Sequence, residues 1–203
     1  MQLLQELPGL FAGSESASQQ HPVAGDDQPL HAALIVEETK KAHLMGINIT
    51  TWGPQAASFM KARLFDAGLV CLVEHRQPPE KVGKIRKDMA RGNWSCSVTP
   101  AVPGMGMGFS SGCLVAWRSS WQGRPLTFGS LAEKQGRAAF AELSFPGLKI
   151  TVAALYVWVG VGPAGANLEL LADVARILQG NGQPFLAFAD WNLEPQDPET
   201  PGG

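Results

Sequence analysis

The chain has 203 residues, of which 45% are hydrophobic and 17% charged, and its formal net charge is -2. This length suits one principal domain with a sizeable core, and the composition excludes a low-complexity chain. The near-neutral charge excludes a protein whose whole surface attracts nucleic acid, although it leaves room for a local basic patch.

The first 42 residues predict a flexible leader. Residues 13–29 are polar and turn-forming, and the opening MQLLQELPGLFAG has neither the basic start of a secretory signal nor the length of a membrane span. Cys71, Cys96 and Cys113 lie far apart without CxxC spacing, which favours small core residues in a reducing compartment. We therefore expect a soluble intracellular protein with no membrane partner.

Strand and helix signals alternate from His43 onward. β-Branched residues predict a first strand over residues 43–52, which ends at the breaker Trp52-Gly53-Pro54. Apolar residues at helical spacing predict a helix from Pro54 to the glycine at 68, and a buried strand over residues 69–73 follows. A second helix is expected between Pro79 and Gly92, with Val82, Ile85 and Met89 on its apolar side and Lys84, Lys87 and Arg91 on the other.

The second half of the chain is richer in strands. Strands near residues 94–99 and 113–117 flank the glycine-rich loop PGMGMGFSSG and are expected to pair. Residues 137–158 form the strongest hairpin, with Pro146-Gly147 suited to the centre of a type II turn. A helical face then precedes the final strand PFLAFAD, and its apolar residues are Leu168, Leu171, Val174, Ala175 and Leu178.

Polar side chains stand within or just after three of the predicted buried strands. These are Asn48, Glu74 and the pair Asp190 and Asn192. Adjacent strand ends can bring such groups together at one edge of a sheet, where oxygen ligands suit Mg²⁺ or Mn²⁺ better than zinc. Each residue also has a simpler interpretation, because loops after strands are polar and both Asn and Asp favour turns.

Four motifs in order resemble those of the endonuclease/exonuclease/phosphatase superfamily. They are GINITTW with Asn48, LVCLVEHR with Glu74, VAALYVW with Tyr156, and FLAFADWN with Asp190 and Asn192, and they cover residues 43–195. The resemblance implies an α/β (α+β) fold, a four-layer sandwich of two mixed β-sheets flanked by helices. It also implies a divalent-metal-dependent phosphodiester hydrolase.

The resemblance assigns a role to each motif residue. Glu74 matches the principal metal ligand and Asn48 a residue at the metal or its water shell, with Mg²⁺ (or Mn²⁺) as the cofactor. Asp190 matches the aspartate that orients the attacking water, and Asn192 the amide that contacts the scissile phosphate. Tyr156 matches a residue that supports the phosphate or leaving group, and a packed hairpin tyrosine is the equal alternative.

The chain departs from the family pattern at several positions. Val73 replaces a glutamine, and His75 follows Glu74 where a small hydroxyl residue is usual, which alters the support of Glu74. Residue 75 otherwise suits an exposed loop histidine. No histidine matches the family's C-terminal Asp-His pair, so residues 43–203 are expected to represent the N-terminal part of the domain, with a sandwich that is incomplete at its C-terminus.

Two functions remain open at this stage. The first is a metal-dependent endonuclease that acts on nucleic acid, with ADWN and VEHR resembling endonuclease-like domains of mobile elements. The second is a truncated, inactive derivative that serves as a binding module or is a gene remnant. Fold analogy does not choose among DNA, RNA, inositol phosphate and lipid substrates. The basic side of the predicted helix carries Lys84, Lys87 and Arg91, and we interpret it as a solvated face rather than as a contact for phosphate.

Overall fold

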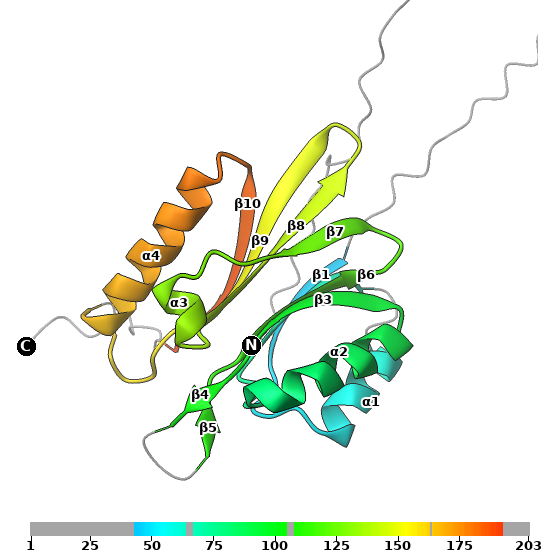
Figure 1. The fold of residues 1–203 in the computed structure, drawn as a ribbon, viewed down its shortest axis with the longest axis horizontal. Helices are drawn as coiled ribbons and strands as arrows, with labels where there is room; N and C mark the ends of the chain where they lie inside the picture. The colour runs from blue at the N-terminus through cyan, green and yellow to red at the C-terminus, as the bar shows by residue number, and fades with distance from the viewer. Residues whose placement is uncertain (1–42, 64–66, 105–107, 163, 193–203) are drawn as a thin grey trace, which may run out of the picture.

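The computed structural model describes residues 43–63, 67–104, 108–162 and 164–192 (Figure 1). The leader predicted over residues 1–42 lies outside these ranges. Within them, two four-stranded sheets face each other and helices cover their outer faces. No helix in these ranges has both the length and the apolar composition needed to cross a lipid bilayer.

The first sheet is mixed and carries the first two motifs. Its order is β1-β2-β6-β3, with β1 and β2 parallel and the other pairs antiparallel. The expected strand over residues 43–52 ends earlier, at Asn48, because Thr50 adopts a left-handed φ of 60° and donates its N–H to the Asn48 side chain. The strands are β1 (His43–Asn48), β2 (Ala67–Val73), β3 (Trp94–Thr99) and β6 (Cys113–Arg118).

The second sheet is also mixed and is built around the predicted hairpin. Its order is β10-β9-β8-β7, with β9 and β10 parallel. Phe145 pairs with Leu148 across Pro146-Gly147, and Gly147 has the positive φ of 73° that the third position of a type II turn requires. The strands are β7 (Gln122–Leu126), β8 (Ala138–Phe145), β9 (Leu148–Tyr156) and β10 (Phe185–Asp190).

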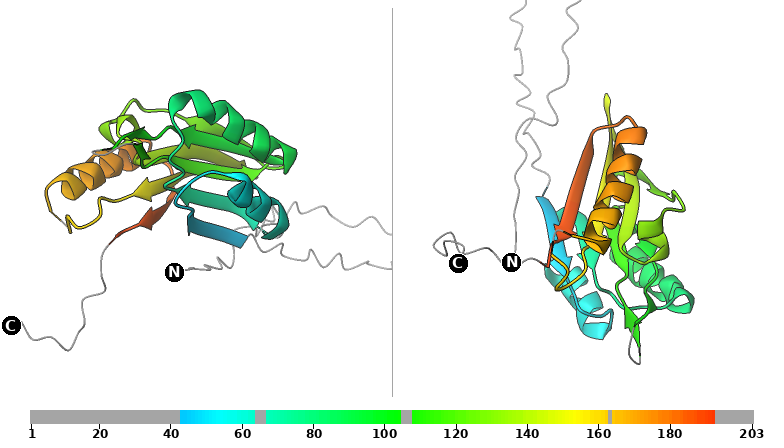
Figure 2. Two further views of the ribbon diagram at one scale, coloured as in Figure 1. Left: turned by 90° about the horizontal axis from the view of Figure 1, so that it is seen from below. Right: turned by 90° about the vertical axis from the view of Figure 1, so that its left-hand side faces the viewer.

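Three apolar clusters hold four layers together. The central cluster lies between the sheets and includes Leu69, Val115 and Val152, all at most 1% exposed. The outer clusters pack helices onto each sheet, as the views in Figure 2 show. The first sheet is covered by α1 (Pro54–Arg63) and α2 (Val82–Arg91), which follows the short 3-10 turn η1 (Pro79–Lys81), and the second by α3 (Leu131–Lys134) and α4 (Ala166–Gly180). The predicted layered α/β fold is confirmed.

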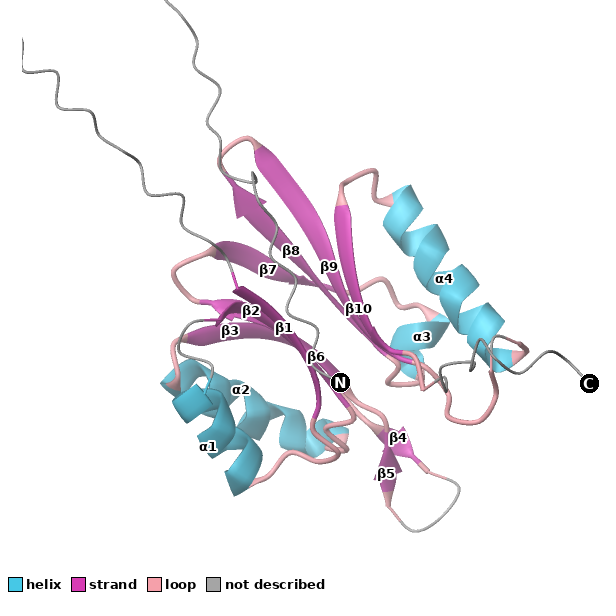
Figure 3. Cartoon of the chain, turned by 180° about the vertical axis from the view of Figure 1, so that it is seen from behind, coloured by secondary structure: helices cyan, strands magenta, loops and turns pink. Residues whose placement is uncertain are grey.

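The connection between β3 and β6 contains a small extra ribbon. Strands β4 (Val102–Pro103) and β5 (Phe109–Ser110) pair within the glycine-rich segment, and β3 pairs with β6 as expected. Strand β1 is an edge strand of the first sheet and β10 is an edge strand of the second, and the two lie side by side where the sheets meet (Figure 3). These two sheet edges are therefore in contact.

The three cysteines pack in or near the core as free thiols. Cys71 and Cys113 are buried, and burial raises the pKa of both thiols far above its usual range. Cys96 is half-buried, and burial raises its pKa to about 11. All three thiols are therefore protonated and weakly nucleophilic at neutral pH.

The buried face of α4 differs from the predicted one. Leu168 is 55% exposed and Ala175 is also exposed, whereas Leu170 is 1% exposed. Asn167 and Asp173 turn inward instead because they satisfy backbone groups. The Asn167 amide bonds to Trp158 N and O and to Gly162 O, and Asp173 accepts from Ala132 N. Val174 and Leu178 of the predicted face are buried, so apolar spacing placed the helix face correctly in part.

This difference makes a direct prediction for two neighbouring leucines. Leu170→Ala should lower the free energy of unfolding by about 3 kcal/mol, because it leaves a cavity under α4. Leu168→Ala should change it by less than about 0.5 kcal/mol, because that side chain is mostly in solvent. Urea denaturation of both variants and the parent checks this, and a larger loss for Leu168→Ala would restore the face predicted from spacing.

Candidate active site

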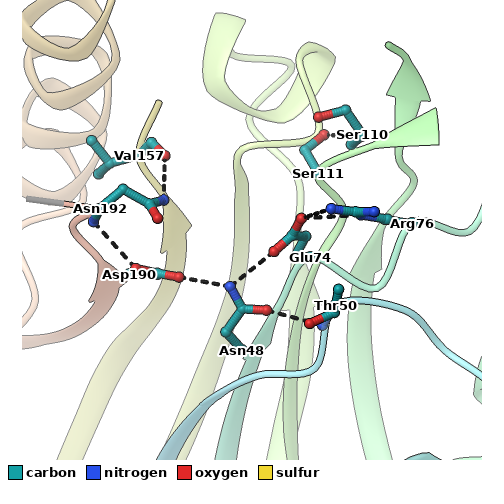
Figure 4. Close-up of polar contacts among 9 residues, drawn as sticks. All are labelled: Asn48, Thr50, Glu74, Arg76, Ser110, Ser111, Val157, Asp190 and Asn192. Atoms are coloured by element: carbon teal, nitrogen blue, oxygen red, sulfur yellow. Dashed lines mark hydrogen bonds and ion pairs between the residues drawn. The ribbon is translucent and has the colours of Figure 1, made fainter. Parts of the chain in front are cut away.

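Four strand ends bring the predicted residues to one edge of the sandwich, and all of them except Tyr156 are drawn in Figure 4. Asn48 ends β1 and Glu74 directly follows β2. Tyr156 and Asp190 end β9 and β10 and are paired in register. Because each of these strand pairs is parallel, its two carboxyl ends lie side by side, and the contact between β1 and β10 brings the two pairs together. The roles of these residues stay predictions.

The Asn48 amide links the two carboxylates. Its Nδ2 donates to Glu74 Oε2 over 2.9 Å and to Asp190 Oδ2 over 2.7 Å. Its Oδ1 accepts from Thr50 N over 2.9 Å, which fixes the orientation of the amide. One side chain of the first sheet thereby binds the last strand of the second.

Asn192 secures the end of β10. Its backbone N–H donates to Asp190 Oδ1 over 3.2 Å, and its Nδ2 donates to Val157 O over 2.8 Å. The residue adopts a left-handed φ of 47°. The side-chain Nδ2 anchors Asn192 to the backbone, and the backbone N–H of Asn192 then orients the Asp190 carboxylate. A contact from Asn192 to a substrate phosphate stays a prediction.

Glu74 is nearly buried and has a cationic partner. Its exposed fraction is 8%, and its Oε1 accepts from Arg76 Nε over 3.0 Å, with Arg76 Nη2 contacting the same oxygen.

Among the described non-glycine residues, most of those with left-handed φ surround this edge; these are Thr50, Glu74, Arg76, Ser111 and Asn192. Such angles cost about 1–3 kcal/mol each and cluster at functional sites.

His75 is buried, so its interpretation as an exposed loop histidine was wrong. Its ring is 0% exposed, Nε2 donates to Thr99 O over 3.0 Å, and Nδ1 accepts from Gln77 N over 3.0 Å. Burial lowers the pKa of His75 to about 4, so the ring is neutral near neutral pH. A Cβ on Gly112 would lie 2.5 Å from this ring, which explains why that position is glycine. His75 fixes the loop and is unsuited to proton transfer.

The position of Tyr156 is compatible with a packed hairpin tyrosine and also with a residue that supports a phosphate. It is 5% exposed and packs in the cluster between the sheets. Burial first, and then the charge and hydrogen bonding of Glu74, raise the pKa of its phenol, while Arg137 opposes the shift. The phenol is thus packed and also lies within the electrostatic field of the site.

Arg137 lies beside the candidate site, and the sequence did not single it out. It is 3% exposed at the start of β8, and its guanidinium lies 3.5 Å from the Trp158 ring centre and 4.6 Å from that of Tyr156. Its Nη1 donates to Tyr156 O over 3.4 Å, and its Nε lacks an acceptor among the described residues. A charged residue directly before the mostly apolar strand β8 was the available signal.

The donor chemistry at this edge suits a hard cation. Glu74 and Asp190 supply carboxylate oxygens, and Mg²⁺ is commonly held by one or two carboxylates while it keeps several waters. No cluster of three or more His, Cys, Asp or Glu side chains arranged for a metal occurs in the described parts of the chain. The two carboxylates are suitable ligands for a hard cation that keeps most of its water, and the identity of the ion stays a prediction.

The basic side of α2 is partly neutralised. Lys84 Nζ lies 2.8 Å from Asp88 Oδ2, and Arg91 Nη1 lies 3.4 Å from Asp88 Oδ1. These ion pairs hold the pKa of Asp88 below its usual range. They suit the solvated face favoured by the sequence.

Solved structures identify the fold. The chain matches the catalytic domain of human Nocturnin over 76% of its own residues and 65% of that chain, with 15% identity and a TM-score of 0.52. It matches the 3'-5' exonuclease NExo from Neisseria meningitidis over 74% and 57%, with 13% identity and a TM-score of 0.50. It also matches an endonuclease/exonuclease/phosphatase family protein from Leptotrichia buccalis over 73% and 66%, with 11% identity and a TM-score of 0.50. The fold is that of the endonuclease/exonuclease/phosphatase superfamily.

This finding confirms the resemblance seen in the sequence at the level of the endonuclease/exonuclease/phosphatase fold. The chain spans from 57% to 66% of the length of these three structures. No family model and no curated protein matches the sequence. At these identities the likeness establishes the fold, and the candidate site stands on its own geometry.

The single tyrosine makes the electrostatics of the site measurable. Ultraviolet titration of the phenol should give a Tyr156 pKa above the ordinary value of about 10, because burial and the Glu74 carboxylate both disfavour the phenolate. Glu74→Gln should lower this pKa, whereas Glu169→Gln, an exposed control on α4, should leave it unchanged. An equal Tyr156 pKa in all three proteins would contradict the described position of Glu74. Circular dichroism confirms folding over the pH range.

Proposed function

We propose that this chain carries a divalent-metal-dependent phosphodiester hydrolase site that acts on nucleic acid. The observation that carries the proposal is the bridge from Asn48 to Glu74 and Asp190 at the shared edge of the two sheets. Two carboxylates held close together offer different tasks, because one can bind a cation and the other can bind a water.

Glu74 is the proposed metal ligand and Asn48 its neighbour. Glu74 is nearly buried at the end of a fully buried strand, so its position is rigid. A bound divalent cation would supply positive charge opposite the phosphoryl oxygens. Asn48 links Glu74 and Asp190 and fixes their orientation, because its Nδ2 donates to both.

Asp190 is the proposed base or orienting group for the attacking water. Its Oδ1 is held by Asn192 N and its Oδ2 by Asn48, so the carboxylate plane is fixed. Fixed orientation lowers the entropy cost of placing a water in line with a phosphoester. Tyr156 and Asn192 are proposed to support the phosphate, and the buried Arg137 adds positive charge 4.6 Å from the centre of the Tyr156 ring.

Nucleic acid is the proposed substrate class. The matched NExo protein is a 3'-5' exonuclease, and another structure of it, with a TM-score of 0.51, contains a product DNA hairpin. The matched ANGEL2 protein, with a TM-score of 0.51, is a 2',3'-cyclic phosphatase in complex with adenosine-2',3'-vanadate. The structures that share the fold thus support a phosphoester attached to a nucleoside.

Metal-dependent nicking of supercoiled plasmid by the full chain tests the function. Mg²⁺ or Mn²⁺ should permit nicking and EDTA should stop it. Glu74→Gln and Asp190→Asn should each reduce the rate about 100-fold or more, because each removes a charged group from the reacting centre while preserving side-chain size.

Glu169→Gln is the matched control, since it removes an exposed carboxylate on α4 and should nick at the parent rate. Equal nicking by the parent and Glu74→Gln would refute the assigned site. Metal-dependent binding of an oligonucleotide without any cleavage would instead favour the alternative function, a binding module that does not turn over substrate.

A further inference from the structure

The loop after β2 presents Glu74 and Arg76 to the same side of the molecule (Figure 4). Their φ angles are 64° and 52°, and His75, the residue between them, is buried. The backbone is held by His75 N donating to Gly112 O (3.2 Å) and by Arg76 N donating to Ser111 O (3.0 Å). Non-glycine residues keep such angles only where their surroundings impose them. The loop itself therefore places Arg76 beside Glu74.

Both carboxylate oxygens of Glu74 already accept hydrogen bonds. Arg76 donates to Oε1 from Nε over 3.0 Å and forms an ion pair with the same oxygen through Nη2. Asn48 donates to Oε2 over 2.9 Å. A hard cation needs carboxylate lone pairs that face it, so it competes with the guanidinium for Oε1.

We propose that Arg76 is an internal cation that neutralises Glu74 in the metal-free protein and leaves Oε1 when a divalent cation binds. The inference rests on the proposed function, because it takes Glu74 as the metal ligand. Arg76 is thus a positioning residue for the site, since it acts through Glu74.

The exposure of the two side chains matches this exchange. The Arg76 side chain is 45% exposed and that of Glu74 is 11% exposed. The long Arg76 side chain can rotate into water while its backbone stays anchored to Ser111 and Glu74 stays held by Asn48. The carboxylate therefore remains in place as its partner changes.

Competition for one oxygen has consequences in both directions. Binding of the metal and contact by Arg76 oppose each other, and thermodynamic linkage requires the effect to be reciprocal. Loss of the Arg76 charge should tighten metal binding, and saturation with metal should release the Arg76 side chain. Loss of Arg76 should also destabilise the metal-free protein, because a nearly buried carboxylate loses its counter-ion.

Calorimetric titration of the full chain with Mn²⁺ tests the inference. Arg76→Gln should lower the Mn²⁺ Kd about fivefold or more. Arg76→Lys should have a smaller effect, because lysine keeps the charge without the two-nitrogen contact, and it carries the test if Arg76→Gln does not fold. Arg91→Gln is the control for net charge, since it removes an exposed arginine paired with Asp88, and its Kd should equal that of the parent.

The outcomes separate this inference from the proposed function. An equal Kd for the parent and Arg76→Gln, with binding weakened by Glu74→Gln, would overturn the exchange and leave the metal site standing. Binding that Glu74→Gln does not weaken would overturn the metal site itself and the exchange with it. The NMR signal of the Arg76 Nε–H group, identified by its loss in Arg76→Gln, should shift on addition of Mg²⁺. An unchanged signal at saturating Mg²⁺ would contradict displacement.

Discussion

The candidate site depends on the two hydrogen bonds that the Asn48 amide donates. This amide donates to a carboxylate from each sheet, at 2.9 and 2.7 Å, and it does so from the last residue of β1. Two neighbouring carboxylates repel each other, and a donor that they share offsets part of that repulsion. Arg76, which is bonded to Glu74, and the buried Arg137, which interacts electrostatically with Glu74, add the positive charge that the amide lacks. The negative charge of the two carboxylates is therefore partly offset by neighbouring positive charge, while the edge stays accessible to solvent at the exposed Asn48.

Much of the fold follows from local sequence. The Pro146-Gly147 turn, the fully buried β2 and the apolar stripe of α2 depend on neighbouring residues, so pattern and turn chemistry suffice to predict them. The face of α4 depends on distant partners. Asn167 and Asp173 point inward because backbone groups near Trp158 and Ala132 need them, and apolar spacing gives no weight to such bonds.

The candidate site divides in the same way. Asn48, Glu74 and Asp190 are predictable because strand ends and ordered motifs mark them. Arg76 depends on two left-handed backbone angles that no residue type in the loop announces, since neither position is glycine. His75 looks like a surface residue between Glu74 and Arg76, and only the contacts of its ring with Thr99 and Gln77 reveal its structural use.

The bond between Asn48 and Asp190 also spans 142 positions of sequence. A chain that has formed only one of its sheets has no site, because each sheet contributes one carboxylate. A ligand bound between them stabilises only the assembled sandwich, by mass action, and a distant mutation that loosens either sheet lowers occupancy without touching the ligand. Ligand binding at this edge thus reports whether both sheets have formed and packed together.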